Sequence, residues 1–156
     1  MSEHLAGRIA IVTGAGSGIG QSIAWRFVAE GADVLGVDLN QTTLAETATQ
    51  IGNGPGRFES LVVDITEELA PQRIVDTCRS ALGSADILIN NAGIGASRPV
   101  HETDDENLDN FLNVNFRSGF RLTREFVSRR LQIARPGVII HLASVFGMQG
   151  FPTSSV

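Results

Sequence analysis

Residues 13–20 read Thr13-Gly-Ala-Gly-Ser-Gly-Ile-Gly20 and directly follow a short β-branched run, residues 9–13. From position 19 onward, apolar residues recur at the spacing of a helix. Glycines at positions 14 and 18 allow a tight turn and a close approach of the backbone to a ligand, and glycine at position 20 allows close helix packing. The unpaired N–H groups at such a helix start attract anions. This stretch therefore predicts a strand, a phosphate-binding turn and a helix, in that order.

Two interpretations of the glycine-rich stretch remain open. It is either an ordinary strand-to-helix turn or the binding loop for the diphosphate of a dinucleotide, and its place between a strand and a helix favours the second. Its glycines follow the pattern Gly-x-x-x-Gly-x-Gly, one residue longer than the common Gly-x-Gly-x-x-Gly fingerprint. The loop residues that we predict to contact the cofactor are Gly14, Ser17, Gly18, Ile19 and Gly20.

Short apolar runs alternate along the chain with longer segments of helical periodicity, which is typical of repeated β-α-β units. Because the runs are apolar nearly throughout, we expect parallel strands that are buried on both faces. These runs occupy residues 9–13, 34–38, 58–63, 87–90 and 138–142. Residues 108–126 show the periodicity of one long helix. No linker or repeat divides the sequence, so we expect residues 1–156 to form a single α/β domain.

Composition and charge narrow the classes of partner. Of the 156 residues, 42% are hydrophobic and 19% are charged, which is typical of a globular protein. The net charge of −5 disfavours nucleic acid and anionic membrane surfaces. The single cysteine, Cys78, excludes an internal disulfide, and the first residues lack the pattern of a signal peptide, so we expect a cytoplasmic protein. We predict no membrane span and no metal site.

Two aspartates end predicted strands. Asp38 ends the second strand, where a carboxylate can accept hydrogen bonds from both hydroxyls of an adenosine ribose. The same carboxylate would repel a 2′-phosphate, and the neighbouring Leu39 provides no positive charge to offset this, so the sequence favours NAD over NADP. The alternatives for Asp38 are a solvated acid or a helix N-cap. Asp64 ends the third strand and can bond the adenine amino group, but it also fits a helix-entry turn.

In their order, these motifs resemble those of the short-chain dehydrogenase/reductase family. The matching pieces are the glycine-rich stretch, Asp38, Asp64, Asn90-Asn-Ala-Gly93, Asn115 and Ser144. The resemblance covers the whole chain and implies a doubly wound parallel sheet of the Rossmann type, with strand order 3-2-1-4-5. It also implies hydride transfer between NAD(H) and a small-molecule secondary alcohol or ketone, by a homo-oligomer. Further cofactor contacts that it implies are Leu39, Ile65, Asn91, Ala92 and Gly93.

The candidate catalytic residues are Asn115 and Ser144. Asn115 falls on the apolar stripe of its helix, where a buried amide needs a hydrogen-bond partner, and a neighbouring backbone group would be enough. In the family, the matching asparagine holds a water in a proton relay. Ser144 follows the fifth strand, where ligands of open α/β sheets bind, although a serine there, taken alone, is more often a turn residue. The resemblance makes its hydroxyl the group that bonds the substrate oxygen.

The sequence departs from the family at the catalytic centre. Family members carry Tyr-x-x-x-Lys on the helix after the fifth strand, where the tyrosine is the general acid/base and the lysine lowers its pKa. These 156 residues contain no tyrosine and no lysine, since all twelve residues counted as Lys or Arg are arginine. We therefore expect the front part of an enzyme, with its sheet truncated after the fifth strand. Two other hypotheses remain open, a nucleotide-binding module without chemistry and an inactive fragment.

Overall fold

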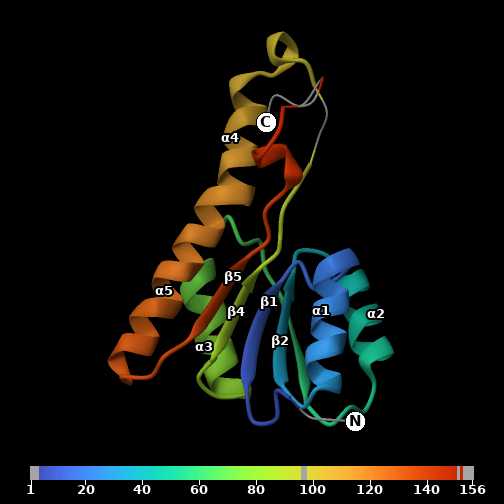
Figure 1. Ribbon diagram of the computed structural model, residues 1–156, viewed down its shortest axis with the longest axis vertical. Helices are drawn as coiled ribbons and strands as arrows, with labels where there is room; N and C mark the ends of the chain where they lie inside the picture. The colour runs from blue at the N-terminus through green and yellow to red at the C-terminus, as the bar shows by residue number, and fades with distance from the viewer. Residues whose placement is uncertain (1–3, 96–97, 151, 153–156) are drawn as a thin grey trace.

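Five parallel strands form the central sheet of the protein (Figure 1). This computed structural model describes residues 4–95, 98–150 and 152. The strands are β1 (Ile9–Thr13), β2 (Asp33–Asp38), β3 (Phe58–Val62), β4 (Ile87–Asn90) and β5 (Val138–His141). They lie in the order β3-β2-β1-β4-β5, so the predicted doubly wound topology is confirmed. In sheets of this kind, ligands bind at the carboxyl ends of the strands beside the point where the strand order reverses, which here is β1.

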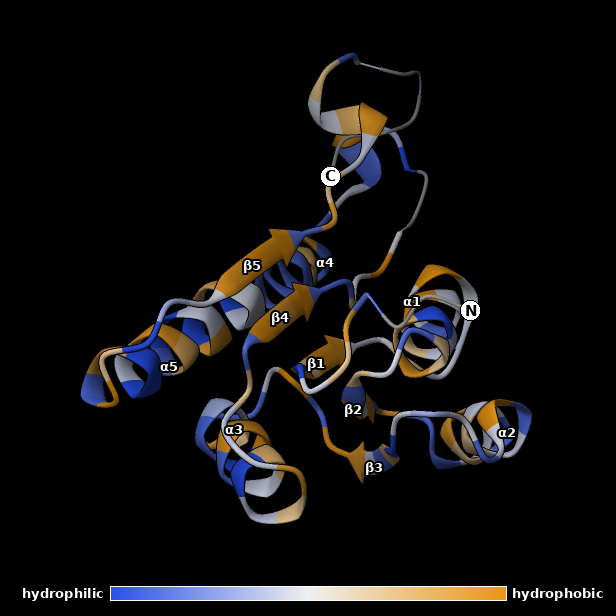
Figure 2. Ribbon diagram, turned by 60° about the horizontal axis from the view of Figure 1, so that its bottom comes forward, coloured by the Kyte–Doolittle hydropathy of each residue, from blue (hydrophilic) through white to orange (hydrophobic). Residues whose placement is uncertain are grey.

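Helices cover both faces of the sheet (Figure 2). One face carries α1 (Gly18–Ala29) and α2 (Gln41–Ile51), and the other carries α3 (Ala70–Ala81) and α5 (Ser118–Gln132). Successive side chains of β1 divide between the two layers, since Val12 packs in the same buried cluster as Ala24 of α1, and Ile11 packs with Ile74 of α3. Burying each large aliphatic side chain contributes roughly 1.5–3 kcal/mol to folding. The central strands therefore form a firm platform for the loops at their carboxyl ends.

The two edge strands are less buried than their sequences predict. In β5, Val138 is 54% exposed and Ile140 is 45% exposed, while Ile139 between them packs against the α3 and α5 layer. In β3, Glu59 and Ser60 are exposed. An apolar run is buried on both faces only where both helical layers reach it, and the layers described here stop short of β5 on the α1 side. The expectation of burial on both faces is confirmed for β1, β2 and β4 and is wrong for β3 and β5.

A π-helical segment interrupts the helix between β4 and β5. The helix runs through α4 (Asp105–Phe111), the π-helical segment η2 (Leu112–Arg117) and α5. A π turn holds more residues than an α turn, so it changes which side chains face the sheet. Leu122 and Phe126 are buried as predicted, but Leu108 is 39% exposed and Leu112 is 45% exposed. The prediction of one continuous apolar face along this helix is therefore wrong on the N-terminal side of α5.

Local side-chain chemistry fixes where several helices begin. The carboxylate of Asp104 accepts a hydrogen bond from the Asn107 N–H at 2.8 Å at the start of α4, and the Asn40 Oδ1 accepts from the Thr42 N–H at 3.0 Å at the start of α2. Two short 3₁₀ helices, η1 (Val100–Glu102) and η3 (Val145–Gly147), lie in the loops after β4 and β5. Within the described part of the chain, no helix is long and apolar enough to cross a membrane.

Candidate functional site

The glycine-rich loop connects β1 to α1 at the carboxyl edge of the sheet. Gly14 has a φ of +68°, and a Cβ atom at this position would lie 2.6 Å from the side-chain amide nitrogen, Nδ2, of Asn91. Both the backbone conformation and the close neighbour therefore require glycine here. Ser17 is the N-cap of α1, and its side chain makes no capping hydrogen bond. The first N–H groups of a helix have no partner within it, so α1 presents donors to an anion in front of the loop.

Buried hydrogen bonds connect this loop to β2 and α2. The Ala15 N–H donates to the Val37 carbonyl at 3.1 Å, which ties the loop to β2. On the other side, the Thr47 hydroxyl of α2 lies 3.0 Å from the Ala15 carbonyl and accepts a hydrogen bond from the Gln21 side chain at 2.8 Å. The Ala15 N–H is thus bonded, and its carbonyl shares the Thr47 hydroxyl with the Thr43 carbonyl, which also lies 3.0 Å from it.

We predict that Thr47→Val lowers the free energy of unfolding by about 1–3 kcal/mol. Valine keeps the branched shape but leaves the buried Ala15 carbonyl and the Gln21 amide without their partner, and an orphaned buried polar group carries a cost of this size. The measurement is denaturant unfolding. The matched control is Thr49→Val on the exposed side of α2, where we expect a change within about 0.5 kcal/mol. Equal losses in the two variants would contradict the role of Thr47.

The Asp38 carboxylate lies directly beside the glycine-rich loop. Its Oδ2 accepts a hydrogen bond from the Gly16 N–H at 2.8 Å, and its Oδ1 accepts from the Asn40 N–H at 3.0 Å. The N-cap of α2 is Asn40, so the alternative of a capping role for Asp38 is wrong. Leu39, the next residue, is 67% exposed. Ile19, at the start of α1, is 64% exposed.

Asp64 uses one of its carboxylate oxygens in a local turn. Its Oδ1 accepts hydrogen bonds from the Thr66 N–H at 2.8 Å and from the Thr66 hydroxyl at 2.7 Å. The sequence left a helix-entry turn open as the alternative, but α3 begins only at Ala70 with Leu69 as its N-cap, so this local turn precedes the helix without starting it. The arrangement holds the side chain in one orientation at the end of β3, and a bond to an adenine amino group stays a prediction.

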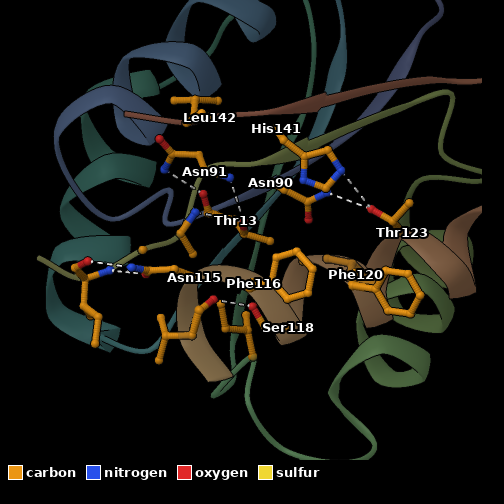
Figure 3. Close-up of a pocket in the computed structure, with 18 of the residues that line it drawn as sticks. Thr13, Asn90, Asn91, Asn115, Phe116, Ser118, Phe120, Thr123, His141 and Leu142 are labelled. Carbon is orange, nitrogen blue, oxygen red and sulfur yellow. Dashed lines mark hydrogen bonds between the residues drawn. The ribbon is translucent and has the colours of Figure 1, made fainter. Parts of the chain in front are cut away.

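Asn91 joins the ends of β1 and β4 (Figure 3). Its side-chain amide donates to the Thr13 carbonyl at 2.8 Å, and the Thr13 hydroxyl accepts from the N–H groups of Asn91 and Ala92, each at 3.1 Å. The hydroxyl lies 3.3 Å from the Ile89 carbonyl, to which it donates. These bonds fix the start of the glycine-rich loop relative to the loop after β4. Thr13, which sequence reasoning did not single out, is the hub of this junction.

A second polar junction connects β4, α5 and β5. The Asn90 amide donates to the Thr123 hydroxyl at 3.0 Å, and the same hydroxyl lies 3.3 Å from the His141 Nε2 (Figure 3). Sequence reasoning missed Thr123 and His141. Polarity alone was no signal, because His141 is exposed and an exposed polar side chain can bond to water. The junction holds the end of β5 against α5, close to the loop that carries Ser144.

Asn115 lies in η2 and is tied to the loop after β4. Its Oδ1 accepts from the Ile94 N–H at 2.8 Å, and its Nδ2 donates to the Ile94 carbonyl at 2.9 Å. The side chain is exposed, so the expectation that its amide would be buried is wrong, because η2 turns this part of the helix away from the core. The expected backbone partner is confirmed. Asn115 therefore clamps the loop that begins with the Asn-Asn-Ala-Gly motif.

Ser144 stands at the exposed start of η3. Its Oγ accepts a hydrogen bond from the Phe146 N–H at 3.2 Å, which matches the turn-serine alternative. It also lines a cavity of about 620 Å³ at the carboxyl ends of β4 and β5. Two exposed aromatic side chains on the opposite wall, Phe116 and Phe120, were not predicted from the sequence. The cavity therefore combines apolar walls with a few hydroxyl and amide groups, which is typical of a small-molecule site.

The predicted site residues divide into two groups along the sheet edge. Those that line the cavity are Ile65, Asn91, Ala92, Gly93, Asn115 and Ser144. The remainder lie outside the cavity wall, on the glycine-rich loop and at the ends of β2 and β3, and are Gly14, Ser17, Gly18, Ile19, Gly20, Asp38, Leu39 and Asp64. Both groups lie on the carboxyl side of one parallel sheet, so an elongated ligand can reach from one group to the other.

Cys78 is the one cysteine of the chain and belongs to the core. Its thiol packs inside the cluster under α3, and burial, with a smaller contribution from the Asp86 charge, raises its pKa to about 12. The sulfur is therefore a neutral thiol near pH 7 and packs as a small apolar group.

Comparison with known proteins assigns this arrangement to a family. The model of the short chain dehydrogenase family matches residues 8–156. A curated relative from Mycobacterium tuberculosis, named (5R,7aS)-5-hydroxy-7a-methyl-1-oxo-2,3,5,6,7,7a-hexahydro-1H-indene-carboxyl-CoA reductase, is 39% identical over 145 residues, which cover 92% of this chain and 55% of the relative. The chain thus spans little more than half the length of that protein.

Solved structures agree with this assignment. A crystal structure of a short chain dehydrogenase from Mycobacterium smegmatis matches with a TM-score of 0.94 at 36% identity, covering 99% of this chain and 66% of that one. A carveol dehydrogenase from Mycobacterium avium in complex with NAD matches with a TM-score of 0.89 at 29% identity, covering 96% of this chain and 59% of that one. This chain therefore belongs to the short-chain dehydrogenase/reductase family, whose members are oxidoreductases that use a nicotinamide cofactor, NAD or NADP.

Proposed function

We propose that this chain is the nucleotide-binding part of an NAD(H)-dependent oxidoreductase that acts on a small-molecule secondary alcohol or ketone. The observation that carries the proposal is the position of Asp38, whose carboxylate stands at the end of β2 beside the glycine-rich loop and is oriented by two backbone N–H groups. An ionised carboxylate accepts hydrogen bonds from ribose hydroxyls and repels a 2′-phosphate. When bound, NAD supplies the acceptor, and NADH the donor, of a hydride.

The residues of the chain would divide the work of binding between the two groups of the site. The N-terminal turn of α1, starting at Gly18, would face the diphosphate, with Ile19 and Leu39 on the apolar sides of the adenosine. Asn91, Ala92 and Gly93 would line the path toward the cavity. At the far end, the Ser144 hydroxyl would bond the substrate oxygen, and Asn115 would keep the loop at Ile94 in place.

We expect the chain to bind NAD more tightly than NADP, and Asp38→Ala to reduce that preference by about tenfold or more. The substitution removes both the ribose hydrogen bonds and the repulsion of the 2′-phosphate, and each charge-assisted hydrogen bond contributes about 1.5–3 kcal/mol. Calorimetric titration of dilute protein with each cofactor measures the preference. Equal or tighter binding of NADP by the unmodified chain, or an unchanged ratio of dissociation constants in Asp38→Ala, would overturn the assignment.

A second candidate function is a nucleotide-binding module without chemistry. By themselves, these 156 residues contain neither the tyrosine nor the lysine that act in the proton transfer of the family, so this stretch on its own would bind NAD without turnover. The two functions share the same NAD site and differ in turnover. An assay of alcohol oxidation therefore separates them once NAD binding has been established.

A further inference from the structure

We propose that Gly16 determines cofactor selectivity together with Asp38. In this proposal, the missing side chain at position 16 leaves the space that the Asp38 carboxylate occupies, and the Gly16 N–H holds the carboxylate there. Sequence reasoning did not include Gly16 among the cofactor contacts. The inference rests on the proposed use of NAD, and it concerns how the chain keeps its selecting carboxylate in position.

The contact between the two residues is close and specific. The Gly16 N–H donates to the Asp38 Oδ2 at 2.8 Å. A Cβ atom built at position 16 would lie 2.9 Å from both the Cγ and the Oδ2 of Asp38, and 2.5 Å from the Thr43 Oγ1. Real Cβ atoms essentially never approach other heavy atoms closer than 3.0 Å. An alanine at this position would therefore force at least one of these neighbours to move.

Backbone conformation does not explain the glycine at this position. Gly14 and Gly18 have positive φ angles, whereas the φ angle of Gly16 is not positive. A side chain at position 16 would therefore bring no strain of its own to the backbone. The requirement for glycine comes from the neighbouring carboxylate and hydroxyl. Glycine at position 16 thus leaves room for the Asp38 side chain.

The carboxylate is the group that would yield. The loop backbone is restrained, because the Ala15 N–H is bonded to β2 and its carbonyl lies 3.0 Å from a hydroxyl of α2. Thr43 lies in the first turn of α2, where its hydroxyl donates to the Asn40 carbonyl at 3.3 Å, and Thr43→Ala removes this neighbour as a separate test. The carboxylate itself is held by the N–H groups of Gly16 and Asn40, and the first of these bonds comes from the residue that the substitution changes. The Asp38 carboxylate is the end of a side chain at the edge of the sheet and can rotate about its own bonds. A methyl group at position 16 would therefore turn the carboxylate away from the loop.

Displacing the carboxylate affects the two cofactors in opposite directions. Bonds from the ribose hydroxyls of NAD depend on the position of both carboxylate oxygens, so NAD binding weakens. The 2′-phosphate of NADP meets less repulsion, and the Gly16 N–H, released from the Asp38 Oδ2, becomes a donor beside it. The ratio of the two dissociation constants therefore reports the position of the carboxylate, whereas a general loss of binding would weaken both cofactors alike.

The test is calorimetric titration with NAD and with NADP of four proteins, the unmodified chain, Gly16→Ala, Asp38→Ala and the double variant. We expect Gly16→Ala to reduce the preference for NAD by about tenfold, as the loss of one charge-assisted hydrogen bond implies. In the Asp38→Ala background, the same substitution should change the ratio by less than about twofold, because no carboxylate remains to be displaced. The matched control is Gly150→Ala, at a glycine with nothing within 4 Å of the added Cβ, which should leave both affinities unchanged.

The possible failures are distinguishable. An unchanged ratio in Gly16→Ala, together with a reduced ratio in Asp38→Ala, would overturn the role of Gly16 and leave the NAD assignment intact. A ratio near one in the unmodified chain would overturn the assignment itself. If Gly16→Ala does not fold, the double variant Gly16→Ala/Thr43→Ala is used instead. It removes the 2.5 Å contact between the new Cβ and the Thr43 Oγ1 and keeps the two 2.9 Å contacts with the Asp38 carboxylate. That variant should show the same shift relative to Thr43→Ala, and no shift there would also overturn the proposal.

Discussion

The 156-residue chain, verified by mass and supplied with NAD and a panel of secondary alcohols, is expected to form no NADH above the uncatalysed background. Its residues include no tyrosine and no lysine, so no positioned phenol can exchange a proton with the substrate. A positioned general acid/base contributes about 10²–10⁴-fold to the rate, and the loss of substrate positioning lowers it further. Absorbance of NADH at a high enzyme concentration measures the result.

An internal control accompanies this assay. Ser144→Ala should be as inactive as the unmodified chain, since polarising the substrate oxygen has little effect where no group can take its proton. Binding of NAD by the same sample shows that the inactive protein is folded at the cofactor end. Turnover by the mass-verified chain that disappears in Ser144→Ala would contradict the prediction and point to another proton acceptor.

Concentration-dependent association is the second large effect that we expect. The edge strand β5 presents Val138 and Ile140 to solvent on the α1 side of the sheet, beside an unpaired row of backbone groups. Exposed apolar edge strands pair with further strands, and charged side chains prevent this. The opposite edge illustrates the protection, because β3 carries the exposed Glu59. Light scattering over a range of protein concentrations is therefore expected to show growing particles.

Ile140→Lys is expected to suppress this association and to change the free energy of unfolding by no more than about 0.5 kcal/mol, because its side chain is half exposed. The cofactor titrations can use this variant as their background. The matched control is Ile139→Ala on the opposite face of β5, which packs against the buried cluster and should lower the free energy of unfolding by about 2 kcal/mol or more without suppressing association. A monodisperse, unmodified chain at all concentrations would show that the exposed edge is harmless.

The strand order and the helical layers could be predicted because their signals are local. Apolar runs and helical spacing follow from neighbouring residues, and strand pairing in such folds has few solutions. Burial of β5 could not be predicted, because an apolar run such as residues 138–141 looks the same whether or not a second helical layer covers it. The π-helical segment was also missed, since its residues fit a regular α-helix pattern and only packing reveals the change.

At the site, sequence reasoning found the residues whose position along the chain defines their role. Asp38 and the glycine-rich loop lie immediately after strands, and both lie at the predicted edge of the sheet. Thr47 and Thr123 were missed, because each has a hydrogen-bond partner more than thirty residues away along the chain. Nothing in their own surroundings separates them from the other threonines. Long-range polar contacts of this kind become visible only in three dimensions.

The π-helical segment η2 limits how this family of chains can change in length. Each residue of an α-helix turns the chain by about 100°, so an insertion or deletion within a regular helix rotates everything that follows by that angle. Here the wider turn already absorbs the extra residue between α4 and α5. Loss of one residue from Leu112–Arg117 would restore a regular helix, but it would also turn Asn115 away from Ile94 or turn Leu122 out of the core. We therefore expect a change in the number of residues of this segment to disturb the chain more than a change in their identity.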